Sequence, residues 1–125
     1  MQQSVTDQII ALAGQHPNIE VLWLYGSQAK GNAEADSDYD LAVAFSDRQS
    51  LPDYYGEQLA SEWAQKTGQA ISVVDINTIP TPLAVAVIYD GIVLLSANDL
   101  RLRAEEQRVW SLWEEYEYEF KRLNS

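Results

Sequence analysis

Blocks of hydrophobic and polar positions follow one another along the chain, and their period switches repeatedly between that of a helix and that of a strand. Residues 19–25 form a short continuous apolar run, which is typical of a buried strand. The first half of the chain is predicted to form a helix at residues 4–15, a strand at 19–25, a polar segment with one helical turn at 26–37, a strand at 38–45, a loop at 47–52, a helix at 54–67 and a strand at 70–76.

The second half contains one ambiguous segment. A short helix is predicted from residue 82 to about residue 89, although its run AVAVIY could also be extended, and periodicity does not decide between them. A fourth strand is predicted at residues 91–96, and a long helix from about residue 98 to residue 123. This order of elements predicts a single α/β or α+β domain over residues 1–125, with a small sheet of about four strands flanked by helices.

The composition is that of a globular protein with a strong negative charge. Apolar residues make up 46% of the 125 residues, and the net charge is −11. The 8 lysines and arginines are scattered, so an extended nucleic-acid ligand would be repelled and is not expected. The chain has no cysteine, no signal-peptide pattern at its start and no apolar run long enough to span a bilayer, which suits a protein of the cytoplasm.

Alternating carboxylates stand at the start of the second predicted strand. Because side chains alternate along a strand, Asp38 and Asp40 project from one face, with Cα atoms about 6.5 to 7 Å apart. Two carboxylates this close repel each other, and a shared divalent cation such as Mg²⁺ relieves the repulsion. Asp36 has the same phase, so periodicity alone does not choose the pair, and a solvated acidic loop is the alternative.

A Gly-Ser turn ends the first predicted strand. Gly26 lets a phosphate approach the backbone, and Ser27 offers both its hydroxyl and its N–H. Lys30 adds a positive charge nearby. The segment GSQAKGN lacks the ending of a Walker A loop, and a plain strand-ending turn is the alternative interpretation.

The spacing G-S-x10-D-x-D, from Gly26 to Asp40, resembles the signature of the DNA polymerase β-type nucleotidyltransferases. The longer stretch YGSQAKGNAEADSDYDLAV looks most like the minimal nucleotidyltransferases, or MNT domains, which pair with HEPN-domain toxins in toxin–antitoxin modules. The spacing from Ser27 selects Asp38 and Asp40 rather than Asp36. The resemblance implies the nucleotidyltransferase fold, with a small mixed sheet and a long C-terminal helix.

The resemblance also implies a role for particular residues. It assigns Gly26 and Ser27 to the triphosphate of ATP, and the charge of Lys30 makes that residue a further candidate for nucleotide binding. Asp38 and Asp40 would bind two Mg²⁺ ions. The family's third carboxylate lies at the end of a neighbouring strand, where Asp75 in ISVVD is the matching residue. Asp75 would help hold the catalytic metal and favour loss of the acceptor hydroxyl proton.

The implied reaction is the transfer of AMP from ATP to a tyrosine hydroxyl of a partner HEPN ribonuclease, which silences the toxin. A hetero-oligomer of the two proteins is expected. Two other functions stay open. The chain is alternatively a catalytically idle module of the same fold that neutralises the toxin by binding alone, or a nucleotidyltransferase that acts on small molecules, as in aminoglycoside resistance.

An aromatic stripe runs along the predicted C-terminal helix. Trp110, Trp113, Tyr116 and Phe120 belong to it. Such a stripe is typical of a helix that packs over a sheet as the last element of the core, and it also suits a surface on which a partner docks.

Overall fold

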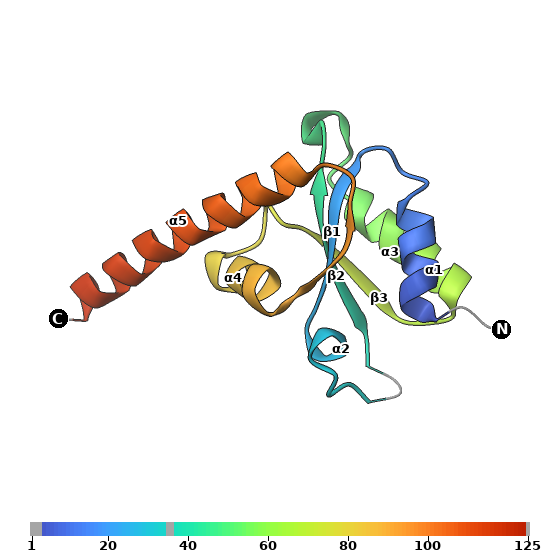
Figure 1. Cartoon of the computed structure of the whole chain (residues 1–125), viewed down its shortest axis with the longest axis horizontal. Coiled ribbons are helices and arrows are strands. Elements are labelled where there is room, and N and C mark those ends of the chain that lie inside the picture. The colour runs from blue at the N-terminus through green and yellow to red at the C-terminus, as the bar shows by residue number, and fades with distance from the viewer. Residues whose placement is uncertain (1–3, 35–36, 125) are drawn as a thin grey trace.

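The computed structural model describes residues 4–34 and 37–124 of the chain, which form a sheet with helices on both faces (Figure 1). The helices are α1 (Val5–Ala13), α2 (Ser27–Lys30), α3 (Tyr55–Thr67), α4 (Thr81–Asp90) and α5 (Asp99–Leu123), the 3₁₀ turn is η1 (Arg48–Ser50), and the strands are β1 (Ile19–Tyr25), β2 (Tyr39–Phe45), β3 (Ile71–Asp75) and β4 (Ile92–Ser96). The predicted fold class is confirmed, and the ambiguous segment at residues 82–89 is helical.

The sheet is mixed, with the strand order β3-β2-β1-β4. Strand β1 lies antiparallel to β2 and to β4, whereas β2 and β3 run parallel. The parallel pair is joined through α3, since parallel strands need a crossover connection. The end of β1 and the start of β2 therefore meet at one end of the sheet, and the end of β3 lies toward the other end.

Each face of the sheet has its own hydrophobic core. On one face Leu41 and Val43 of β2 pack in a cluster with Trp63 of α3. On the other face Ala42 of β2 clusters with Val109 of α5 and with residues of α4. Because side chains alternate along β2, its odd-numbered residues face α1 and α3, and its even-numbered residues face α4 and α5.

The first turns of α5 are anchored by a buried carboxylate. Glu105 is 4% exposed and accepts hydrogen bonds from Arg101 Nε at 2.9 Å, Arg108 Nε at 2.7 Å and Asn77 Nδ2 at 3.0 Å. Burial alone would raise the pKa of Glu105, but the hydrogen bonds from Asn77, Arg108 and Arg101 outweigh it and lower that pKa. Arg101 also donates to the carbonyl oxygen of Phe45 at 3.0 Å, which ties α5 to the end of β2.

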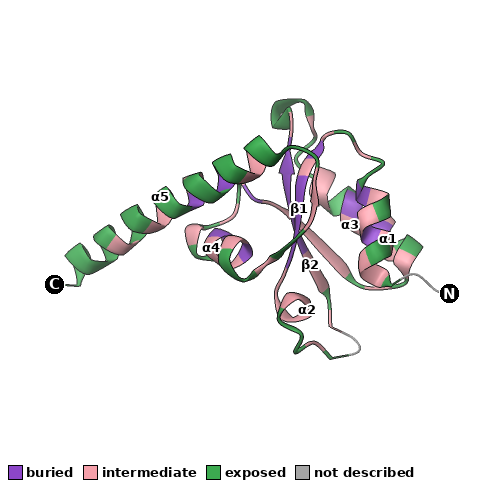
Figure 2. Cartoon of the chain, viewed as in Figure 1, coloured by how far each residue is buried: buried purple, intermediate pink, exposed green. Residues whose placement is uncertain are grey.

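Only the anchored half of α5 contributes to the core. Buried positions on this helix lie in the part next to the sheet, and the outer turns are largely exposed (Figure 2). Tyr116 is 44% exposed and Phe120 is 60% exposed. The interpretation of the aromatic stripe as core is therefore wrong for its outer part, because the helix extends beyond the elements that would cover it. None of the helices in the described residues combines the length and apolar character that a membrane crossing requires.

Candidate active site

The Gly-Ser turn and the carboxylates meet at one end of the sheet. Tyr25, the last residue of β1, pairs with Asp40 of β2 in the antiparallel register. Gly26 follows with φ 75° and ψ −156°, a conformation that only glycine adopts readily. A Cβ placed on Gly26 would lie 2.5 Å from Oδ2 of Asp40. The backbone of the turn and the carboxylate are therefore in close contact, and any side chain at position 26 would displace that carboxylate.

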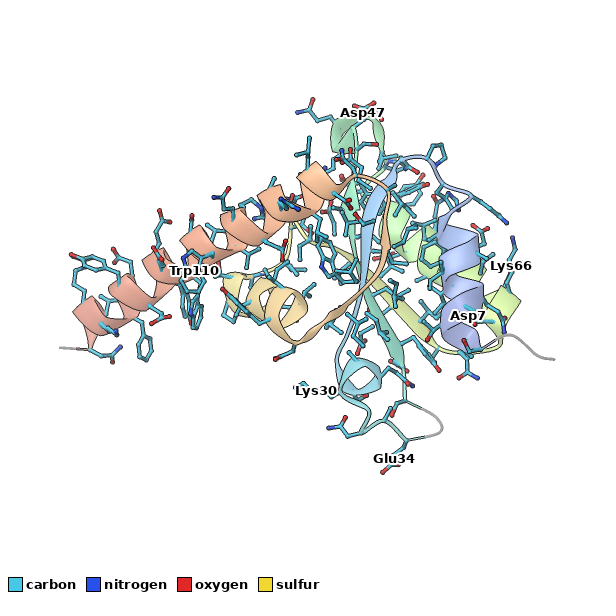
Figure 3. The ribbon with its side chains drawn as sticks, viewed as in Figure 1. Asp7, Lys30, Glu34, Asp47, Lys66 and Trp110 are labelled. Carbon is cyan, nitrogen blue, oxygen red and sulfur yellow. The ribbon has the colours of Figure 1, made fainter. Side chains whose placement is uncertain are left out.

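The short helix α2 starts directly after this contact. The N–H groups of Ala29 and Lys30 donate to the carbonyl oxygen of Gly26 at 3.1 and 3.2 Å. Ser27, as the first helical residue, has a backbone N–H with no partner inside the helix. Gly31 ends α2 in the left-handed conformation, with φ 73°. Lys30 is exposed on α2, at the opposite end of the molecule from Asp47 (Figure 3).

Asp38 and Asp40 concentrate negative charge at this site. Burial raises the pKa of Asp40, and the nearby charge of Asp38 raises it further. Burial also raises the pKa of the Tyr25 hydroxyl, with a further contribution from Asp40. Among the described residues, neither Asp38 nor Asp40 forms an ion pair with a lysine or arginine. Two close oxygen ligands without a counter-charge fit a divalent cation such as Mg²⁺.

The structure does not bring Asp75 to this site. In the parallel register Asp40 pairs with Ser72, whereas Asp75 pairs with Val43. Residues paired in this way share a face, so Asp75 belongs to the face that carries α1 and α3, while Asp40 belongs to the face that carries α4 and α5. The prediction that Asp75 joins Asp38 and Asp40 in one metal site is wrong.

Asp75 has partners of its own. Its Oδ2 accepts from Arg48 Nε at 2.6 Å, and its Oδ1 accepts from the backbone N–H of Asn77 at 2.8 Å. It lines a cavity of about 300 Å³ together with residues that include Phe45 and Val73. Its charge is therefore neutralised within the chain, at the end of the sheet far from α2.

Ser72 occupies the place where a third carboxylate would face Asp40. It lies directly opposite Asp40 in the register and on the same face of the sheet. Its hydroxyl carries no charge, and the described residues contain no group of three acidic, histidine or cysteine side chains that would hold a metal ion. Asp36, the other candidate with the phase of Asp38, lies outside the described residues.

Sequence reasoning missed Tyr25 and Ser72 as members of this site. Tyr25 looked like the last residue of an apolar run, and only the β1–β2 register places it beside Asp40. Ser72 lies inside the apolar strand ISVVD, where an uncharged serine gives no chemical signal. A correct register for β2 and β3 would have found it.

The sequence that forms this site matches a known protein family. The profile of the polymerase beta nucleotidyltransferase family matches residues 7–100, which include β1, α2, β2 and β3. The chain belongs to this family. The contact between Gly26 and Asp40 lies within the matched residues.

Comparison with curated proteins identifies a relative in this family. The protein adenylyltransferase MntA of Shewanella oneidensis is 29% identical over 92 residues, which are 73% of this chain and 65% of MntA. The matched segment thus spans less than two thirds of that relative's length.

Solved structures share the nucleotidyltransferase fold. A crystal structure of a toxin–antitoxin complex with AMP-PNP has a TM-score of 0.82 at 23% identity, over 94% of this chain and 94% of that chain. A structure of the tri-AMPylated Shewanella oneidensis HEPN toxin in complex with its MNT antitoxin has a TM-score of 0.77 at 22% identity, over 98% of this chain and 95% of that chain. At these identities the likeness shows the fold.

Proposed function

We propose that this chain is a Mg²⁺-dependent antitoxin of the cytoplasm that transfers AMP from ATP to a tyrosine hydroxyl of a HEPN-domain toxin. The observation that carries the proposal is the contact of Gly26 with Asp40, which joins a phosphate-binding turn to a carboxylate pair without a counter-charge. The adenylyltransferase name of the related MntA and the complexes of structural relatives with an AMPylated HEPN toxin support the choice of acceptor.

In this proposal the residues of the turn bind the triphosphate, and the carboxylates at the start of β2 bind the cation. The backbone at Gly26 admits a phosphate oxygen, and Ser27 donates to it from its N–H and its hydroxyl. Lys30 contributes a positive charge from the last position of α2. Asp38 and Asp40 hold the cation.

When bound, Mg²⁺ supplies positive charge that neutralises the triphosphate and polarises the phosphoryl group under attack. Asp38 and Asp40 would hold these ions, and the ions would supply their charge next to the triphosphate. The acceptor hydroxyl releases its proton to water and forms a bond to the α-phosphorus of ATP, as the bond from that phosphorus to pyrophosphate breaks.

The test is transfer of label from ATP to a purified cognate HEPN-domain toxin. We expect that incubation with α-labelled ATP and Mg²⁺ labels a tyrosine of that protein, identified by peptide mass spectrometry. Chelation of the metal, or the double change Asp38→Ala with Asp40→Ala, should abolish the label. If the wild-type chain transfers no AMP at any Mg²⁺ concentration, the proposed activity is refuted.

One observation favours a second function, neutralisation of the toxin by binding alone. Ser72 supplies no carboxylate to take up the acceptor proton or to add a metal ligand. The two functions differ in cells that express the toxin. If the double variant protects such cells as well as the wild-type chain does, binding is the mechanism.

A further inference from the structure

The apolar stripe of α5 continues from the core into solvent. Leu102 and Val109 pack into the cluster between the sheet and α4. Positions 113, 116 and 120 follow Val109 at steps of four, three and four, so they lie on the same side of the helix. The side of α5 that is buried in its first half is therefore aromatic in its second half, where no other element covers it (Figure 1).

The aromatic side chains form an ordered strip. Trp113 and Tyr116 stack with their ring centroids 5.5 Å apart and their planes at 15°. Trp110 contacts Tyr89 of α4 edge to face at 6.1 Å, and Figure 3 draws it on the side of α5 toward α4. Beyond them, a shallow hollow of about 330 Å³ is lined by Trp113, Tyr116, Glu117, Phe120 and Lys121. Large exposed aromatic surface of this kind marks interaction sites.

The opposite side of the same turns is acidic. Glu114, Glu115 and Glu119 line a second shallow hollow there, with Tyr118 among them. A lipid surface is a poor match, because membrane-surface helices carry lysine and arginine on their polar face. A second copy of this chain is also a poor match, because each copy carries a net charge of −11.

We propose that the outer half of α5, residues 110–123 together with Tyr89, is the docking surface for a protein partner with an apolar groove bordered by lysines and arginines. The apolar groove covers the strip around Phe120, and the basic border faces the glutamates around Tyr118. Aromatic residues dominate the energetics of such interfaces, and complementary charge speeds and orients association.

The strip also leads toward the candidate active site. Tyr89 lies near the end of α4, two residues before Gly91. A Cβ on Gly91 would lie 3.0 Å from the carbonyl oxygen of Leu24, which is two residues before Gly26 on the same strand. A partner seated on the strip is thus guided toward the site. In taking the partner to be the HEPN toxin, this inference rests on the proposed function.

The experiment compares two aromatic-to-glutamate changes on opposite sides of α5. Phe120 is 60% exposed on the strip, and Tyr118 is 67% exposed on the acidic side, so neither change should affect folding. Binding of a purified cognate HEPN-domain toxin is measured by calorimetry. We expect Phe120→Glu to weaken binding at least about 30-fold and Tyr118→Glu to tighten it, because the second change adds a carboxylate that faces the basic border of the partner.

Two further measurements complete the test. Glu114→Lys with Glu115→Lys should weaken binding and reduce its dependence on salt, and all variants should bind a fluorescent ATP analogue with Mg²⁺ as the wild-type chain does. Loss of AMP transfer with intact docking would refute the proposed function and leave this inference standing. Equal binding by Phe120→Glu and the wild-type chain would overturn the inference. So would absence of any complex, or a dimer of the chain alone that Phe120→Glu dissociates.

Discussion

Asp40 and Asp75 are strand carboxylates on adjacent strands, and their surroundings are opposite. Asp75 lies three residues beyond Ser72, the partner of Asp40 in the register, and is neutralised by Arg48 at 2.6 Å. Asp40 has a raised pKa and Asp38 as its charged neighbour. The comparison shows that the role of a strand carboxylate is indicated by the groups that neutralise its charge. The chain itself neutralises Asp75, whereas Asp40 forms no ion pair with a lysine or arginine among the described residues.

The largest expected effect separates these two carboxylates by activity. Asp40→Asn removes a metal-binding oxygen from the site and should lower AMP transfer about a thousandfold. Asp75→Asn, the matched control, should leave transfer nearly unchanged because Asp75 lies on the other face of the sheet. Both are measured with labelled ATP under saturating Mg²⁺. Comparable losses in the two variants would contradict the separation of the two carboxylates.

Thermal stability without metal tests the repulsion between Asp40 and its neighbouring carboxylate. Asp40→Asn removes the repulsion between two close carboxylates, so its thermal stability without Mg²⁺ should equal or exceed that of the wild-type chain. Added Mg²⁺ should stabilise the wild-type chain and not the variant, since only the wild-type site binds the ion well.

Glu105 extends the comparison to a buried carboxylate with neutralising partners. Glu105→Ala removes the carboxylate shared by Arg101 and Arg108, leaves Arg101 only the longer ion pair with Glu20 at 3.7 Å, and should cost about 3 kcal/mol of unfolding free energy. Urea unfolding measures this cost at neutral pH.

The pH dependence follows from the direction of the shift. The folded-state pKa of Glu105 is lowered below its ordinary value of 4.5. Its ionised form therefore adds stability above that ordinary value, and the contribution is lost as pH falls through the lowered folded-state pKa. We expect Glu105→Ala to reduce the acid sensitivity of unfolding, and an unchanged pH profile would contradict the role of this cluster.

A smaller effect should come from completing the carboxylate set. Ser72→Asp places a third negative charge opposite Asp40 on the same face and should raise Mg²⁺ affinity about tenfold. Ser72→Asn adds similar bulk without charge and is the control. Calorimetric titration with Mg²⁺ decides the matter. If Ser72→Asp binds no more tightly than Ser72→Asn, position 72 lies outside the reach of the metal.

The smallest expected effect concerns the half-exposed partner of Asp75. Arg48 is 41% exposed, so Arg48→Ala should cost less than about 1 kcal/mol. Asp75 also keeps the hydrogen bond from the N–H of Asn77 at 2.8 Å. Chemical denaturation measures the cost, and AMP transfer should stay at the wild-type level. A large loss of transfer in this variant would place the Arg48 end of the sheet in the reaction.

The periodicity of the sequence was sufficient to predict the helices and strands, but not the register in which the strands pair. The strand at residues 19–25 and the helices at residues 54–67 and 98–123 were predicted nearly to the residue, because each is long or strongly periodic. Alternation along ISVVD places Ile71, Val73 and Asp75 on one face of β3. It gave no means of deciding which face of β3 continues that of Asp40, since that depends on the register with β2.

The sequence also contained no indication of the point along α5 at which burial ends. The stripe from Leu102 to Phe120 has one period throughout, so it predicts one buried side. Burial ends where α4 and the sheet end, and that boundary arises from tertiary packing. The same hydrophobic pattern therefore marks a buried side in the first half of α5 and an exposed side in its outer half.

The clamp of Glu105 by Arg101, Arg108 and Asn77 has a consequence for the thermodynamics of association. These hydrogen bonds fix the first turns of α5 to the rest of the fold, so the outer turns project as a formed helix before any partner binds. A disordered segment that folds on binding loses conformational entropy at that moment. A preformed helix has already lost it, so more of the interaction energy of the aromatic side chains remains as affinity.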